Sequence, residues 1–351
     1  MTQIKRIRDW NLPIGSLPTG PKNKITDVAG VTVGHVTIKQ DNSFTGVTAI
    51  LPHQGNLFQE KVVAASHVLN GFGKTTGLTQ INELGTIETP ILLTNTLSVG
   101  NCSTGLIHYM LKDNPEIGRT TGTINPVVAE CNDMFLNDIR HIFLNERHVF
   151  GAIEDAKTDF EEGAVGAGTG MRCFSLKGGI GSSSRTVEIQ NHTYTVGVLV
   201  LTNYGRLDDL VIKGENVGKK ISELMKNDVQ NHKDRGSVII IVATDLPVSE
   251  RQLERIIKRC GVGLSHTGSK MAHGSGDIVI GFSTAATVPH KLEEKLLKHN
   301  YIHEEELDKP FHAVSEATEE AILNSMVTAE TTVGRDGNTV ESLKDYIDQL
   351  Y

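Results

Sequence analysis

One Gly-Ser bond, between Gly236 and Ser237, stands between a polar segment, residues 227–236, and the most apolar run of the chain, Val238–Ala243. A serine hydroxyl can attack the carbonyl carbon of the preceding residue through a five-membered ring. Glycine at that preceding position adds no side chain to crowd the attack and tolerates a strained backbone. The pair therefore has the composition that intramolecular autoproteolysis requires.

Hydrolysis of the ester formed in this attack would leave Ser237 with a free α-amine. Such an amine has a pKa of roughly 8 in an unperturbed chain, so it can act as a general base beside its own hydroxyl. Taken alone, the pair also fits a serine that merely begins a strand after a turn. Four other Gly-Ser pairs occur in the sequence, but none leads directly into so apolar a run.

The elements around this bond must hold it rigidly. A continuous apolar run such as Val238–Ala243 predicts a strand buried on both faces. Ser249 begins a predicted helix with the capping-box spacing Ser-x-x-Gln, which ends at Gln252. Other predicted strands lie in 25–38, 46–51, 91–93, 127–129, 193–201 and 277–282, and other predicted helices in 104–111, 214–226 and 313–329. Strands and helices alternate throughout, so the fold class is α/β or α+β with layered sheets.

Composition excludes several classes of protein. The net charge of the 351 residues is -8, and no run of Lys or Arg occurs, which argues against nucleic acid as a partner. No apolar stretch is long enough to span a membrane, and the polar N-terminus lacks the apolar core of a signal peptide. Four cysteines without a C-x-x-C pair suit reduced thiols, and we expect a cytoplasmic protein. These are Cys102, Cys131, Cys173 and Cys260.

Motifs for cofactors and metals are incomplete. Gly73-Lys74-Thr75 resembles the end of a phosphate-binding loop, but Val68 stands where the first glycine is needed. The run 166–171 lacks the last glycine of a dinucleotide-binding pattern, and 263–267 lacks the last glycine of a nucleophile elbow. The 14 histidines include no H-E-x-x-H pattern. We therefore expect no metal and no organic cofactor.

Five blocks of sequence, in order along the chain, resemble the L-aminopeptidase/D-esterase (DmpA) family, which includes the β-peptidyl aminopeptidases. They are ITDVAGVTVGH (25–35), the glycine-rich run 163–170 followed by KGGIG (177–181), 196–203, GSV through ATD (236–245), and GSGDI (274–278). The resemblance implies one domain over residues 1–351, folded as a four-layer α/β/β/α sandwich. It also implies cleavage into fragments 1–236 and 237–351, and a homotetramer of the cleaved pairs.

The same resemblance implies roles for individual residues. Ser237 matches the nucleophile, and Asn203 matches the amide that stabilises the oxyanion. Ser275 and Asp277 match a second serine and its acidic partner, which would orient the α-amine of Ser237. Glu130 matches the carboxylate that pairs with the free ammonium of the substrate. Without the resemblance, Asn203 is equally explained as a turn residue, and Glu130 as a solvated group at a strand end.

One position departs from the family pattern. Some relatives carry a tyrosine near the oxyanion, two positions after the glutamate, and this chain has Asn132 there. An amide can still donate a hydrogen bond but has a shorter reach, which affects the expected substrate range.

The sequence thus predicts an autoproteolytic serine aminopeptidase or amidase that releases N-terminal residues from short peptides, amino-acid amides or esters. Two alternatives remain open at this point. One is an uncut relative that serves as a binding or scaffold protein. The other is an acyltransferase that passes the same acyl group to an amine instead of water.

Overall fold

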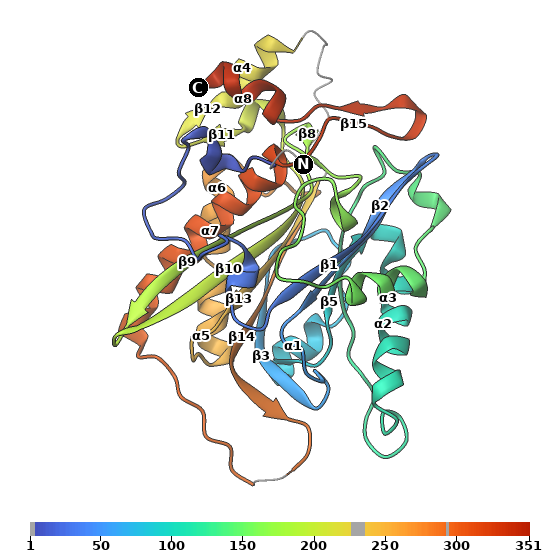
Figure 1. The fold of residues 1–351 in the computed structure, drawn as a ribbon, viewed down its shortest axis with the longest axis vertical. Helices are drawn as coiled ribbons and strands as arrows, with labels where there is room; N and C mark the ends of the chain where they lie inside the picture. The colour runs from blue at the N-terminus through green and yellow to red at the C-terminus, as the bar shows by residue number, and fades with distance from the viewer. Residues whose placement is uncertain (1–3, 226–235, 293–294) are drawn as a thin grey trace.

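The computed structural model of the protein describes residues 4–225, 236–292 and 295–351 (Figure 1). Its strands form two large sheets. The four-stranded sheet has the order β1 (Thr32–Gln40), β2 (Ser43–Leu51), β5 (Ile91–Asn95) and β6 (Val127–Cys131). The six-stranded sheet has the order β4 (Thr86–Ile87), β3 (Glu60–Gly71), β14 (Gly276–Pro289), β13 (Ser237–Thr244), β10 (His192–Asn203) and β9 (Ile180–Ile189). Neighbouring strands are antiparallel except β5–β6 and β13–β14, which are parallel.

Short strands and helices complete the fold. The two-stranded ribbons are β7 (Arg172–Cys173) with β8 (Leu176–Lys177), β11 (Val211–Ile212) with β12 (Glu215–Asn216), and β15 (Thr332–Val333) with β16 (Thr339–Val340). The α-helices are α1 (Leu78–Leu84), α2 (Val99–Asp113), α3 (Glu146–Glu154), α4 (Val217–Leu224), α5 (Glu250–Ile257), α6 (Cys260–His266), α7 (Asp308–Val327) and α8 (Lys344–Leu350).

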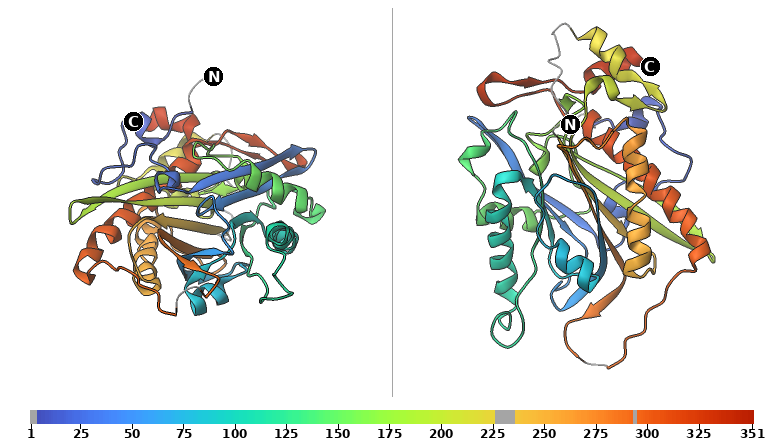
Figure 2. Two further views of the ribbon diagram at one scale, coloured as in Figure 1. Left: turned by 60° about the horizontal axis from the view of Figure 1, so that its bottom comes forward. Right: turned by 180° about the vertical axis from the view of Figure 1, so that it is seen from behind.

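The two large sheets pack face to face, with helices on both outer faces (Figures 1 and 2). One hydrophobic cluster fills the space between the sheets, and a second joins the four-stranded sheet to α2 and α3. A third joins the six-stranded sheet to α5, α6 and α7. Three apolar interfaces between four layers confirm the predicted α/β/β/α sandwich.

Strand β13 lies in the middle of this sandwich. Its residues Val238, Ile240 and Val242 pack in the cluster on the helix side. Its alternate residues Ile239, Ile241 and Ala243 pack in the cluster between the sheets. Because both faces are covered, the strand needs apolar residues at every position, which explains its unbroken apolar run.

The predicted elements are found with some changes in their bounds. Ser249 caps α5 as expected, since its hydroxyl accepts a hydrogen bond from Gln252 N–H (3.2 Å). The predicted helix over 214–226 was wrong at its start, because a turn with positive φ at Lys213 and Gly214 first closes the β11–β12 ribbon. The polar segment before Gly236 and residue 226 lie outside the described residues.

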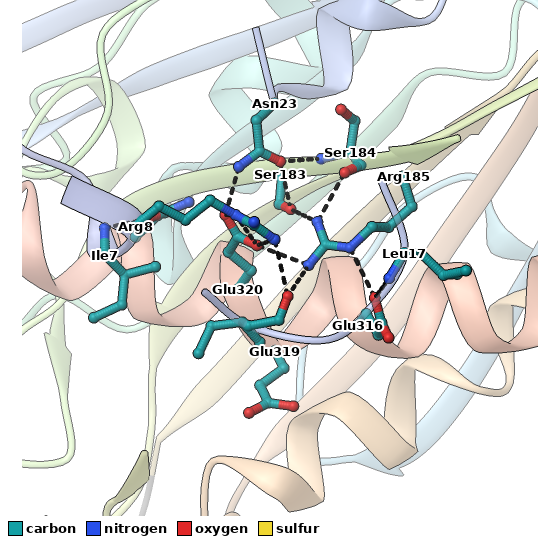
Figure 3. Close-up of polar contacts among 12 residues, drawn as sticks. Ile7, Arg8, Leu17, Asn23, Ser183, Ser184, Arg185, Glu316, Glu319 and Glu320 are labelled. Atoms are coloured by element: carbon teal, nitrogen blue, oxygen red, sulfur yellow. Dashed lines mark hydrogen bonds and ion pairs between the residues drawn. The ribbon is translucent and has the colours of Figure 1, made fainter. Parts of the chain in front are cut away.

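A buried ionic network ties the N-terminal segment to α7 (Figure 3). Arg185, on β9, contacts Glu316 Oε2 (3.0 Å) and Glu320 Oε2 (2.7 Å), and both glutamates belong to α7. Arg8 and Asn23 also bond to Glu320. The side chains of Arg185 and Glu320 are fully buried. The network therefore joins residues that precede the Gly236–Ser237 bond to residues that follow it.

Candidate active site

Ser237 is the first residue of β13, and neighbouring strands on both sides begin or end beside it. Its antiparallel partner is Asn203, the last residue of β10. Its parallel partner is Gly276, the first residue of β14. Ser237 is 5% exposed and Asn203 is 9% exposed. The sheet therefore brings two of the predicted site residues together although 33 positions separate them in the sequence.

The bond before Ser237 is held at its carbonyl group. The Gly236 carbonyl oxygen accepts a hydrogen bond from Gly276 N–H (3.3 Å), the first rung of the parallel β13–β14 ladder. A Cβ atom on Gly236 would lie 2.0 Å from the Asn203 carbonyl oxygen and 2.3 Å from Tyr204 Cα. Position 236 therefore admits only glycine without a shift of the backbone.

Asn203 is held by two backbone groups that fix the orientation of its side-chain amide. Its Oδ1 accepts a hydrogen bond from Arg172 N–H (2.9 Å), and its Nδ2 donates to the Asn132 carbonyl (2.9 Å). An N–H faces the oxygen and a carbonyl faces the nitrogen, so a flipped amide would lose both bonds. Asn203 belongs to the extended strand β10, and the explanation as a turn residue does not apply.

Ser275 and Asp277 form a buried pair at the start of β14. The Ser275 hydroxyl donates a hydrogen bond to Asp277 Oδ1 (2.6 Å), and both residues are 1% exposed. Their two-residue spacing puts the two side chains within hydrogen-bonding reach of each other. The register places Gly276 opposite Ser237, and Asp277 opposite Val238.

Glu130, near the end of β6, is buried and not a solvated surface group. Its carboxylate accepts hydrogen bonds from Lys74 N–H (2.8 Å) and from the Thr96 hydroxyl. Burial raises the pKa of Glu130, and these two hydrogen bonds oppose the rise. A Cβ atom on Gly73 would lie 3.6 Å from Glu130 Oε1 and 3.4 Å from Gly276 Cα. Gly73 therefore lies close both to the carboxylate and to Gly276, the strand partner of Ser237.

Asn132 contacts the site through its backbone. Its carbonyl accepts the hydrogen bond from Asn203, whereas its side-chain Oδ1 accepts from Met134 N–H (3.0 Å) and closes a turn. The residue is partly buried. The short amide thus stabilises the turn that carries the acceptor for Asn203.

Comparison with known proteins decides the family. The sequence profile of peptidase family S58 matches residues 23–340, which is most of the chain. The chain belongs to peptidase family S58. It is 38% identical, over 355 residues, to the β-peptidyl aminopeptidase BapA of Sphingosinicella xenopeptidilytica. That alignment covers 95% of this chain and 88% of BapA.

Solved structures agree with this S58 assignment. The PH0078 protein of Pyrococcus horikoshii OT3 is 48% identical, with a TM-score of 0.93 over 99% of this chain and 97% of that chain. The L-aminopeptidase D-Ala-esterase/amidase of Ochrobactrum anthropi, described as a prototype of the serine aminopeptidases with a variant of the Ntn hydrolase fold, is 34% identical. Its TM-score is 0.90 over 98% of both chains. This S58 chain is thus a peptidase of the N-terminal-nucleophile aminopeptidase type.

Sequence reasoning missed the backbone groups that orient this S58 site. The N–H groups of Arg172 and Gly276 and the carbonyl of Asn132 leave no trace in residue type, since any residue supplies them. Only the strand register and the β7–β8 ribbon reveal them. Arg172 lies between the glycine-rich run 163–170 and the motif 177–181, and neither of these family motifs indicates a role for its backbone.

Other features of this S58 peptidase concern metals and membranes. Among the described residues, no three His, Cys, Asp or Glu side chains gather as a metal site, and no helix is long and apolar enough to cross a bilayer. The four cysteines are buried, and none of them forms a disulfide bond.

Proposed function

We propose that this S58 peptidase cuts its own Gly236–Ser237 bond and then acts through Ser237 as an N-terminal nucleophile. The products are fragments 1–236 and 237–351, which stay together as one domain. The observation that carries the proposal is the position of Ser237 between Asn203 and Gly276 on adjoining strands. That position places a hydroxyl, an amide donor and a polarised carbonyl at one buried sheet edge.

Self-cleavage proceeds in two steps. Ser237 Oγ attacks the carbonyl carbon of Gly236, and the C–N bond of the peptide breaks as the amine of Ser237 takes up a proton. Gly276 N–H already donates to the oxygen on which negative charge develops. Water then hydrolyses the ester and leaves a carboxylate on Gly236 and a free α-amine on Ser237.

In the cleaved enzyme, the α-amine of Ser237 accepts the proton of its own hydroxyl as this attacks the substrate carbonyl. Asn203 Nδ2 carries a second hydrogen, which donates to the oxyanion. Ser275 and Asp277 orient the α-amine. The protonated α-amine gives this proton to the leaving amine or alcohol as the C–N or C–O bond of the substrate breaks and the acyl-enzyme forms. Water then attacks the acyl-enzyme, its proton passes through the α-amine to Ser237 Oγ, and the acyl group leaves as an acid.

Substrates of this site carry a free ammonium group that pairs with Glu130. The buried carboxylate is held by Lys74 N–H and Thr96, so it is pre-oriented for a charge-assisted hydrogen bond. The proposed substrates are short peptides, amino-acid amides and esters. The names of the relatives add β-aminoacyl peptides and D-alanyl esters and amides to this range. Asn132, shorter than tyrosine, leaves more room beside the oxyanion.

We place the enzyme in the cytoplasm as a homotetramer of cleaved pairs. Four copies of the 38.2 kDa chain amount to about 153 kDa. Light scattering coupled to size-exclusion chromatography should give that mass, and a mass near 38 kDa would exclude the tetramer.

Hydrolysis of amino-acid p-nitroanilides, with and without an Nα-acetyl group, tests the aminopeptidase function. The wild type should cleave only the free-amine substrate, and Ser237→Ala should cleave neither. Equal rates on both substrates would contradict the role of the ammonium group.

Product analysis with a competing amine separates hydrolysis from acyl transfer, since a transferase would form the new amide at the expense of the acid.

A further inference from the structure

Lys177, on β8, is a fully buried lysine in the glycine-rich part of the chain. Its Nζ donates hydrogen bonds to the carbonyls of Gly168 (3.0 Å), Met171 (2.9 Å) and Gly178 (2.7 Å). An ammonium group has three protons to donate, and this cage accepts all three. Burying an ammonium group costs free energy, and that cost is high for a residue whose only role is to close a loop.

The Met171 carbonyl belongs to the same peptide group as Arg172 N–H. That N–H donates to Asn203 Oδ1 (2.9 Å). The peptide group therefore lies between the ammonium of Lys177 and the side-chain amide of Asn203. In the β7–β8 ribbon, Lys177 is also the direct cross-strand partner of Arg172.

Hydrogen bonds in such a chain polarise one another. When a cation binds the carbonyl oxygen of a peptide group, the N–H of that group becomes a stronger hydrogen-bond donor. When this N–H binds the oxygen of a side-chain amide, the NH₂ group of the amide becomes a stronger donor as well. The order here is Lys177 Nζ, the 171–172 peptide, and then the amide of Asn203.

We propose that Lys177 is a positioning and polarising residue for Asn203. Its ammonium acts through the 171–172 peptide group, and strengthens the hydrogen bond that Asn203 donates to the oxyanion. The inference rests on the proposed function, in which Asn203 is the oxyanion donor.

The charges around Lys177 come from three other elements. The pKa of Lys177 is lowered to about 7, chiefly by burial and also by the charge of Lys39 on β1, whereas Asp133, in the turn after β6, and Cys173 on β7 oppose this shift. Burial also raises the pKa of Asp133 to about 7. The cage of carbonyl dipoles complements the charged form, which is the form that polarises the peptide.

The test is a double-mutant cycle on the full-length, self-processed enzyme, with kcat and KM for an amino-acid p-nitroanilide. Lys177→Met removes the ammonium and keeps an unbranched apolar side chain. It should lower kcat about tenfold and leave KM within about twofold, since loss of a whole oxyanion donor costs about 10²–10³ in kcat. In the Asn203→Ala background, the same change should cost less than about twofold, because its route to the oxyanion is gone.

Lys219→Met is the control, because Lys219 is exposed on α4 and its charge is not among the causes that shift the pKa of Lys177. It should leave kcat unchanged. If Lys177→Met does not accumulate as folded protein, Lys177→Gln takes its place in the cycle. Equal losses from the Lys177 change in both backgrounds, or no loss, would overturn the inference.

Ser237→Ala, assayed in parallel, separates this inference from the proposed function. If Ser237→Ala is inactive and the effects of the Lys177 and Asn203 substitutions are additive, only the proposed role of Lys177 is refuted. If Ser237→Ala is active, the proposed function itself is refuted.

Discussion

We expect Gly236 to control the proposed self-cleavage, because a side chain at this position would have no space beside the Gly236–Ser237 bond. Gly236→Ala would place a methyl group 2.0 Å from the Asn203 carbonyl oxygen, so the backbone must move and the attacking geometry is lost. We expect the uncut fraction of freshly purified protein to rise strongly, as measured by denaturing gel electrophoresis. Gly122→Ala is the control, because nothing lies within 4 Å of its Cβ. Equal processing of the two variants would show that the contact is irrelevant.

Glu130 should set the affinity for the substrate ammonium. A charge-assisted hydrogen bond contributes about 1.5–3 kcal/mol, so Glu130→Gln should raise KM about 10- to 100-fold with a smaller effect on kcat. Burial raises the pKa of Glu130, and the carboxylate is neutral below that pKa. The KM of the wild type should therefore rise as the pH falls through this raised pKa, and that dependence should vanish in Glu130→Gln. Exposed Glu83→Gln should leave KM unchanged, and a normal KM for Glu130→Gln would refute the assignment.

At the scale of elements, helix α7 is joined to the N-terminal segment and β9 by the network around Arg185 (Figure 3). Glu320→Gln leaves the buried guanidinium of Arg185 with one carboxylate fewer, which should cost about 3 kcal/mol of unfolding free energy. Urea denaturation in the Ser237→Ala background measures this on a single chain. Glu319, on the same helix, points away from the network in Figure 3 and pairs with His266 instead. Glu319→Gln should cost less than about 1 kcal/mol, and similar losses from both variants would contradict the account.

The same network predicts how stability depends on pH. Burial alone would raise the pKa of Glu320, but hydrogen bonding from Arg8 and the charge of Arg185 hold it below its usual value. The stabilisation is therefore complete above the unfolded pKa of about 4.3 and is lost as the pH falls through the lower folded pKa. Urea midpoints measured between pH 3 and pH 6 should fall at the acidic end, and less steeply in Glu320→Gln.

Elements with strong local signals could be predicted from the sequence. The apolar run of β13 and the capping box of α5 are examples, because burial on two faces and a cap leave a pattern within a few residues. Strand β9 is absent from the predicted strands, and it contains the polar residues Ser182, Ser183, Ser184 and Arg185. They are buried because Asn23 and residues of α7, far away in the sequence, supply their partners. Such partners depend on the tertiary fold, so a local pattern does not reveal them.

At the scale of the whole molecule, the site lies where three strands of one sheet meet the end of a strand from the other. Residue types suggested Ser237 alone, and Asn203, Ser275, Asp277 and Glu130 were identified through family resemblance. Their proximity follows from strand register, which long-range pairing determines. The substitutions of Ser237, Asn203 and Glu130 described above test the roles proposed for these three residues.

The fold also accounts for how the two fragments of the proposed cleavage would act as one enzyme. Strand β13, from the second fragment, lies between β10 from the first and β14 from the second. Arg8 and Arg185 precede the cut, whereas Glu316 and Glu320 follow it. Hydrogen bonds, apolar contacts and buried ion pairs therefore connect residues 1–236 with residues 237–351, and they would hold the domain together after the proposed cleavage.

Intact mass under denaturing conditions tests the central claim most directly, with wild type and Ser237→Ala measured side by side. In proportion to chain length, cleavage after Gly236 predicts fragments of about 26 and 12 kDa from the wild type and a single 38.2 kDa species from the variant. A single 38.2 kDa species from both proteins would contradict self-cleavage and favour an uncut binding protein.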